Sequence, residues 1–265
     1  YDEGDYYPDY PWPSDIEEVT IGEGITSVSF CAFEDCTSLK KVTLPTTVST
    51  IGSRAFQNCS ALESVSYAGT AEQWISIYKT DSRLNTMFVH CLADDRNVCG
   101  GRIGSSSGTT FWKYEEDGTL TVSGTGEIQD YFNTSSNGNN YPDRPWENIP
   151  YTKLVVEEGI TKIGWRAFAN ADSLVEVQLP STLTEIKGYM YYSNTAGAFE
   201  SCDALETIEI PAGVTKIGCF TFSQCSALKN IVIPDSVNVI GYGAFYNCGS
   251  FESVYYRGTS EQWNS

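Results

Sequence analysis

Nine cysteines are the side chains with the greatest chemical potential in this sequence. Five of them recur at intervals of 23 residues within each half of the chain: Cys36, Cys59, Cys202, Cys225 and Cys248. Zinc sites place their cysteines about two to four residues apart, so this spacing does not predict a metal. It predicts small apolar side chains that stack inside successive turns of a repetitive fold, each thiol next to backbone carbonyls. Cys31 and Cys219 lie outside the series and are expected to fill space.

Cys91 and Cys99 differ from this series because they flank a short loop. A disulfide between them is compatible with an oxidising compartment, and two free thiols are compatible with a reducing one. The sequence leaves both alternatives open.

The remaining candidates for catalysis are weak. His90 is the single histidine, and no motif supplies it with a partner, so we expect a surface side chain. Adjacent carboxylates occur at Glu17-Glu18, Glu116-Asp117 and Glu157-Glu158. Neighbours in a strand point to opposite faces, whereas glycoside hydrolysis needs two carboxylates that face each other across a cleft. The run Gly104-Ser-Ser-Ser-Gly108 lacks the preceding strand and following helix of a serine elbow. We therefore predict no catalytic residue, no metal ligand, no cofactor and no enzymatic activity.

Charge and composition narrow the class of partner. Sixteen Lys and Arg against 34 Asp and Glu give a net charge of −18. This balance disfavours nucleic acid and anionic membrane surfaces as partners. No apolar run approaches the roughly 18 residues of a membrane helix, so membrane insertion is not expected. The chain starts at Tyr1 without a signal peptide, which suggests a mature form or an excised piece.

The elements that must position these residues are repeats. Ala-Phe or Thr-Phe pairs end at Phe33, Phe56, Phe168, Phe199, Phe222 and Phe245. A run of the form Leu-x-x-Val-x-Leu-Pro follows most of them, as in Leu39–Pro45 and Leu205–Pro211, and then a second short run ends in Ile-Gly. The first run alternates and predicts a strand, proline ends it, and the Ala-Phe-x-x-Cys stretch suits a helical turn. One such coil cannot bury its own core, so coils must stack into a solenoid.

The repeat Leu-x-x-Ile-x-Ile-Pro, followed by Val-x-x-Ile-Gly-x-x-Ala-Phe-x-x-Cys, resembles the BspA-like leucine-rich repeats of bacterial surface and secreted proteins. The segment Gly118–Gly126, with Pro145-Trp146 after it, is similar to the entry segment of such arrays. The resemblance implies a right-handed leucine-rich-repeat solenoid, rich in β-structure with short helical turns, on an exported or cell-surface protein with a binding or adhesion role.

The sequence also contains a longer duplication, which includes several repeats in each copy. Tyr7–Trp12 matches Tyr141–Trp146, and Gly69–Trp74 matches Gly258–Trp263. We therefore expect a first array over residues 1–91, a linker over 92–108 and a second unit over 109–265. Within the second unit, residues 109–130 are predicted to form a β-hairpin cap and residues 150–265 the repeat array. Array one continues past its Gln-Trp pair into a predicted strand around Val89, so the natural protein is expected to continue past Ser265.

One coil is longer than the rest. The interval between Phe168 and Phe199 is 31 residues instead of 23, and the eight extra residues lie between Ile186 and Ala198. Because a coil has a fixed circumference, they should leave it as a loop, where binding residues concentrate. The candidate partner-binding residues are Tyr189, Met190, Tyr191 and Tyr192 of the insertion, Tyr131, Phe132 and Tyr141 of the cap loop, and Tyr255 on an outward strand position. The alternative is that the tyrosines fold back to seal the convex side.

The sequence thus predicts a binding or adhesion module that recognises a host or bacterial surface protein or a glycan. The competing prediction is a rigid spacer that displays another domain of a longer protein. An exposed tyrosine-rich patch favours the first, and a uniformly charged skin favours the second.

Overall fold

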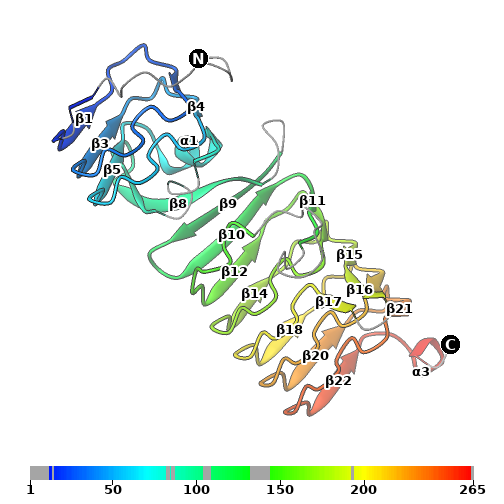
Figure 1. Cartoon of the computed structure of the whole chain (residues 1–265). Helices are drawn as coiled ribbons and strands as arrows, with labels where there is room; N and C mark the ends of the chain where they lie inside the picture. The colour runs from blue at the N-terminus through cyan, green and yellow to red at the C-terminus, as the bar shows by residue number, and fades with distance from the viewer. Residues whose placement is uncertain are drawn as a thin grey trace. The chain divides into compact units, whose positions relative to one another are not determined.

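The computed structural model describes residues 12–13, 15–81, 84, 87–103, 109–131, 144–191 and 194–263. The chain divides into two compact units, Tyr1–Glu116 and Asp117–Ser265. Each unit is built from stacked coils whose strands run parallel (Figure 1).

Unit 1 contains two sheets. The first holds the parallel strands β1 (Glu18–Thr20), β3 (Lys41–Leu44), β5 (Ser64–Tyr67) and β7 (Val89–Cys91). The second holds β2 (Ser27–Val28), β4 (Thr50–Ile51) and β6 (Tyr78–Lys79). Lys41 pairs with Ser64, so the 23-residue sequence interval is the register of the sheet. The predicted solenoid is confirmed.

After these coils the pairing in unit 1 becomes antiparallel. Helix α1 (Ala71–Ser76) begins with a capping box between Thr70 and Gln73, and β8 (Arg96–Ile103) then pairs antiparallel with both β7 and β9 (Thr110–Glu115). Residues 92–108, expected to be a linker, therefore contain an eight-residue strand. The glycines of this segment indicated a linker, but Gly100 has a different role. It allows the strand to lie against the backbone of Trp112.

Unit 2 begins with two strands that extend the sheets of its coils. Strand β10 (Thr119–Gly124) pairs parallel with β12 (Lys153–Val156), and β11 (Gly126–Ile128) pairs parallel with β13 (Ile160–Ile163). Residues 119–128 thus supply one strand to each of two sheets, as a repeat coil does. The two strands predicted around Asp117-Gly118 are present as β9 and β10, and they are consecutive in the order of the sheet.

The other coils of unit 2 extend these sheets. One sheet continues from β12 to β14 (Glu176–Gln178), and a separate sheet holds β18 (Thr207–Glu209), β20 (Asn230–Ile233) and β22 (Ser253–Tyr256). On the other side, β13 is followed by β15 (Glu185–Ile186), β19 (Lys216–Ile217) and β21 (Val239–Ile240). Among the described residues, no ladder joins β14 to β18, the strands on either side of the coil that carries the insertion. The chain ends in α3 (Ser260–Trp263).

Stacked phenylalanine rings run through the core of each unit. Successive ring centroids lie 5.3 Å apart from Phe33 to Phe56, and 5.4 and 5.5 Å apart along Phe168, Phe199 and Phe222. The Pro-Trp pairs begin both stacks, because Trp12 lies 5.2 Å from Phe33 and Trp146 lies 5.6 Å from Phe168. Each indole Nε1 also donates to a backbone carbonyl of the adjoining coil, that of Ala32 and Ala167 respectively.

The cysteine series lies beside this stack. The Sγ atoms of Cys59, Cys202, Cys225 and Cys248 each donate to the carbonyl oxygen of the stacked phenylalanine one coil earlier, at 3.1 to 3.3 Å. All nine cysteines are free. Cys36, Cys59, Cys202 and Cys225 are buried as predicted, whereas Cys248 in the last coil is half-buried. Cys91 and Cys99 are both buried and unpaired, because the register sets Cys91 opposite Arg96.

The Ala-Phe-x-x-Cys stretch is not a helical turn. Two residues in most coils adopt a positive φ, one before the Ala-Phe pair and one before the cysteine position, as in Arg54 and Asn58 or Phe220 and Gln224. These left-handed residues turn the chain sharply. The backbone N–H of Phe33 can then donate to the carbonyl of Ala55, one coil further on, at 2.8 Å.

Array one ends on a buried carboxylate. Asp81 Oδ2 accepts the backbone N–H of Phe56 at 2.8 Å, and its Oδ1 accepts that of Leu84 at 3.3 Å. In the preceding coil the matching N–H finds a backbone carbonyl. Asp81 therefore satisfies the last donor of the stack, which is buried and would otherwise destabilise the fold.

Lys79 is buried beneath α1. Its Nζ lies 4.3 Å from the centroid of the Trp74 ring and donates to the carbonyl of Trp74, near the end of the helix, at 2.8 Å. Burial lowers the pKa of Lys79 to about 7, because the charged amine loses its hydration.

We expect the stacked cysteines to resist modification in the folded protein. Burial raises the pKa of Cys36, which lowers its thiolate fraction, and Cys59, Cys202 and Cys225 are equally enclosed. In a timed thiol-labelling experiment followed by mass spectrometry, half-buried Cys219 and Cys248 should react first, and all nine thiols should react after unfolding. Rapid native modification of Cys59 or Cys202 would contradict the packing described here.

We also expect Lys79 to make stability depend on pH. Above its folded pKa of about 7 and below its ordinary value of 10.5, the folded state is neutral while the unfolded state binds a proton. The free energy of unfolding should therefore rise with pH in this window, by up to about 1.4 kcal/mol per pH unit relative to Lys79→Met. Below pH 7 both states are protonated, and the difference should level off. Urea unfolding of both proteins at several pH values tests this, and a constant difference would contradict it.

Candidate functional site

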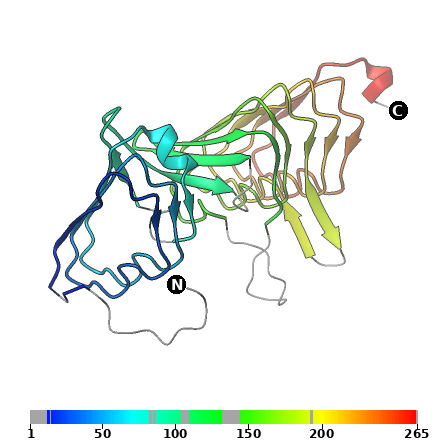
Figure 2. The same ribbon diagram turned by 90° about the horizontal axis from the view of Figure 1, so that it is seen from above.

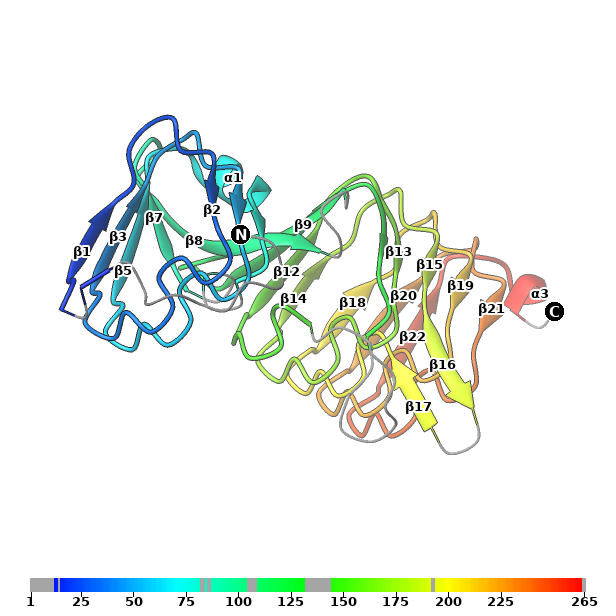
Figure 3. The same ribbon diagram turned by 45° about the horizontal axis from the view of Figure 1, so that its top comes forward.

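The inserted residues form a β-hairpin that leaves the coil. Strands β16 (Gly188–Tyr191) and β17 (Asn194–Gly197) pair antiparallel, with Tyr189 opposite Ala196. Figures 2 and 3 show them as two arrows that project from the stacked coils of unit 2. Glycine is required at both ends, because a Cβ on Gly188 or Gly197 would overlap a carbonyl oxygen of the next coil. The expectation that the extra residues leave the coil is confirmed.

The hairpin carries one packed and one exposed large side chain. The Tyr189 ring lies 5.0 Å from the Trp165 ring of the preceding coil, so this tyrosine folds back onto the solenoid. Met190 is 46% exposed. The prediction of exposed residues therefore holds for Met190, and the alternative of packed tyrosines holds for Tyr189.

A second group of rings lies on the following coils. The Phe220 ring contacts those of Tyr242 and Tyr246, with centroids 5.8 and 6.2 Å apart. Tyr242 is 71% exposed and Tyr246 is 64% exposed. Both side chains present most of their area to solvent while one edge rests on Phe220.

These two groups belong to one surface. The sheet order β13-β15-β19-β21 sets the residues that follow each strand side by side on successive coils. We call this set the aromatic surface, and it consists of Trp165, Tyr189, Met190, Phe220, Tyr242 and Tyr246. The close approach of Gly188 to the backbone of Cys219 joins the hairpin to the coil that carries Phe220.

The other predicted binding residues do not join this surface. Tyr131 is 2% exposed, with its ring 5.9 Å from that of Trp146, so its assignment to an exposed binding surface is corrected. Tyr255 is 60% exposed but lies on β22, in a different sheet. Phe132, Tyr141 and Tyr192 lie outside the described residues, as does the side chain of Tyr191.

Four members of the aromatic surface were not predicted from the sequence, although a signal for them exists. Trp165 and Tyr242 each directly follow the Ile-Gly pair of a coil, and Phe220 follows one residue later. Array one has Ser53 at the first of these positions. Phe30 stands at this position in the first coil of array one, and aligning the coils would have shown that aromatic residues recur there in array two.

Charges around the aromatic surface are paired. Glu127 on β11 lies 2.8 Å from Nζ of Lys187 and 2.9 Å from Nζ of Lys162. Hydrogen bonds from Lys187 and then Lys162 hold the pKa of this carboxyl below its usual range. Lys216 forms a further pair with Glu185 at 2.8 Å. The surface therefore offers aromatic area beside neutralised charges.

The residues that the sequence offered for catalysis form hydrogen bonds and ion pairs with their neighbours. His90 Nδ1 lies 3.2 Å from Asn97 Oδ1, and its Nε2 lies 3.5 Å from Asp95 Oδ1. The adjacent carboxylates lie on the sheet surface, where Glu17 and Glu18 form ion pairs with Lys40 and Lys41. Within the described part of the chain, no three His, Cys, Asp or Glu side chains converge on a metal-sized space. No helix in that part is long and apolar enough to span a membrane.

Comparison with solved structures returns bacterial leucine-rich-repeat proteins. A leucine rich cell surface protein from Faecalibacterium prausnitzii is 24% identical, with a TM-score of 0.47 over 95% of this chain and 62% of the other. A leucine-rich repeat protein from Bacteroides ovatus is 20% identical, with a TM-score of 0.40 over 91% and 63%. The pneumococcal vaccine antigen PcpA is 18% identical, with a TM-score of 0.37 over 97% and 72%. The chain thus spans less than two thirds of the first two proteins.

No curated protein matches the sequence. The sequence model of the BspA type leucine rich repeat region does match it, in six copies over residues 12–82 and 139–264. These ranges cover most of the chain and contain the stacked phenylalanines and cysteines of both units. The chain is therefore a member of the BspA type leucine-rich repeat family.

Proposed function

We propose that this chain is a non-enzymatic binding module that acts outside a bacterial cell and recognises a surface protein or a glycan. The aromatic surface is the observation that carries the proposal. Tyr242, Tyr246 and Met190 present large side chains to solvent on adjoining coils. Soluble proteins rarely leave such an area uncovered unless it serves an interaction.

The chemistry of the surface suits recognition. Tyrosine offers apolar area with a polar tip and loses little conformational entropy on binding. The base of the surface is fixed, because Tyr189 rests on Trp165, and Tyr242 and Tyr246 rest on Phe220. A preorganised surface of this kind binds without first being ordered. The paired charges around Glu127 leave the rings to dominate contact.

The outer face of the long strands differs from the aromatic surface, and this difference supports binding at the aromatic surface. Ion pairs join successive coils there, as in Lys41–Glu18 and Lys153–Glu176, and Arg257–Glu209 reaches across two coils. A pure spacer is expected to carry such a skin on every side, so this face alone would favour the spacer. The aromatic surface breaks that uniformity in unit 2.

Localisation and partner class follow from the family and the charge. The F. prausnitzii protein is described as a cell surface protein, and a secreted or surface location suits an adhesion role. The net charge of −18 disfavours nucleic acid as the partner.

Replacing the exposed side chains should remove binding without unfolding the protein. A glycan array and a pull-down from host surface proteins identify the partner for wild type. We then expect Met190→Ser, Tyr242→Ser and Tyr246→Ser together to weaken its affinity by at least about 30-fold, as for the loss of interface hot spots. The melting temperature should barely change, because these side chains are largely exposed.

Tyr255→Ser is the matched control, since it also removes an exposed tyrosine but from β22. Its affinity should equal that of wild type. Binding that survives the triple change, or that falls with Tyr255→Ser alone, would assign the partner to another face. Tyr189→Ser should cost stability by about 0.5 to 1.5 kcal/mol, because its ring packs on Trp165.

A further inference from the structure

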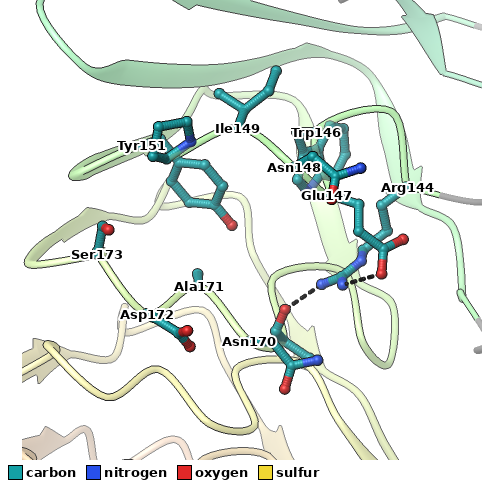
Figure 4. Close-up of a pocket in the computed structure, with 12 residues that line it drawn as sticks. Arg144, Trp146, Glu147, Asn148, Ile149, Tyr151, Asn170, Ala171, Asp172 and Ser173 are labelled. Atoms are coloured by element: carbon teal, nitrogen blue, oxygen red, sulfur yellow. Dashed lines mark hydrogen bonds and ion pairs between the residues drawn. The ribbon is translucent and has the colours of Figure 1, made fainter.

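A cavity of about 240 Å³ opens at the first Phe-containing coil of unit 2 (Figure 4). Its walls come from the segment Arg144–Tyr151, which leads into β12, and from the turn Ala169–Ser173. It is separate from the aromatic surface, with which it shares no residue.

The cavity lies where the cysteine series is interrupted. Ala171 occupies the position that Cys36 holds in the corresponding coil of array one. The bonds from Lys40 N–H to the Glu17 carbonyl and from Val175 N–H to the Thr152 carbonyl are equivalent. They align Ile16 of array one with Tyr151 here. Array one thus packs an isoleucine and a cysteine where unit 2 has a tyrosine and an alanine.

The tyrosine hydroxyl points into the space that the missing thiol leaves. Tyr151 is 3% exposed, and Figure 4 shows its oxygen directed toward Ala171. Among the described residues, this hydroxyl has no hydrogen-bond partner. Burial raises the pKa of Tyr151, so the group stays a neutral donor and acceptor. The hydroxyl faces the open cavity, where it is available to a ligand or to water.

The positively charged side chain in the wall of the cavity already has its hydrogen-bond partners within the protein. The Arg144 guanidinium donates to the carbonyls of Ala169 and Arg166 and to Glu147, the last at 3.0 Å. It is therefore no free cation for an anionic ligand. The groups left to a ligand are the Tyr151 and Ser173 hydroxyls, the Asn170 amide and the Asp172 carboxylate.

This set selects a neutral polyhydroxyl ligand. The hydroxyls and the amide both donate and accept, whereas the carboxylate accepts only. An ammonium group supplies donors alone and would leave the donors of the wall unused. Sugar hydroxyls supply both. The volume corresponds to about eight water molecules at roughly 30 Å³ each, and it falls below the roughly 300 Å³ at which sites for larger ligands begin.

We propose that this cavity is a binding site for a single sugar ring, with the Tyr151 hydroxyl and Asp172 as its hydrogen-bonding partners. The site does not depend on the aromatic surface or on the partner proposed for it.

Two changes test the site on the full chain. Ala171→Cys restores the side chain that the other coils carry and occupies the part of the cavity toward which the Tyr151 hydroxyl points. Tyr151→Phe removes the hydroxyl alone. The probes are free hexoses and N-acetylated hexosamines, with butylamine and inorganic phosphate as competing chemistries, measured by saturation-transfer NMR and titration calorimetry.

We expect at least one sugar to bind wild type, no binding to Ala171→Cys, and affinity lowered about three- to tenfold in Tyr151→Phe, as for one lost hydrogen bond. Tyr255→Phe, the matched control, should bind as wild type does. Melting curves of all variants exclude misfolding as the cause. Binding of butylamine or phosphate without sugar, no binding of any sugar, or undiminished sugar binding in both cavity variants would overturn the proposal.

Discussion

The backbone N–H of each stacked phenylalanine needs an acceptor one coil further on, and most of the structure depends on that constraint. The stacked rings of successive coils lie 5.3 to 5.5 Å apart between centroids. The hydrogen bond from the Phe33 N–H to the Ala55 carbonyl joins one coil to the next beside this stack. The thiol of Cys59 then fills the corner beside the ring and donates to the carbonyl of Phe33. Every coil repeats these demands, which is why a 23-residue register survives in a sequence that otherwise varies.

Features that repeat could be predicted, and features that occur once could not. The parallel register and the buried cysteines follow from positions that recur, such as Val42 and Val65. The antiparallel strand β8 could not be predicted, because its glycines read as a linker until the neighbouring backbone was known. The left-handed turns could not be predicted either, because residues such as Arg54 rarely adopt a positive φ. Here the packing of the stacked coils imposes that φ.

The candidate surface shows the same division. The insertion was visible as eight extra residues, but the fate of each tyrosine depended on packing, so Tyr189 lies on Trp165 and Tyr131 is buried. Tyr242 and Tyr246 were not predicted, because neither stands out from the other residues of its own coil. They become a surface only when neighbouring coils bring them beside Phe220. In a solenoid, single substitutions on successive coils thus add up to one recognition face.

Asp81 gives array one a chemically defined end. Any coil placed before it needs an acceptor that the following coil supplies, and the carboxylate supplies the last one to Phe56. A 23-residue coil inserted or removed upstream would therefore leave the acceptor of this last N–H unchanged. The number of coils can then differ while the same residues close the end of the array.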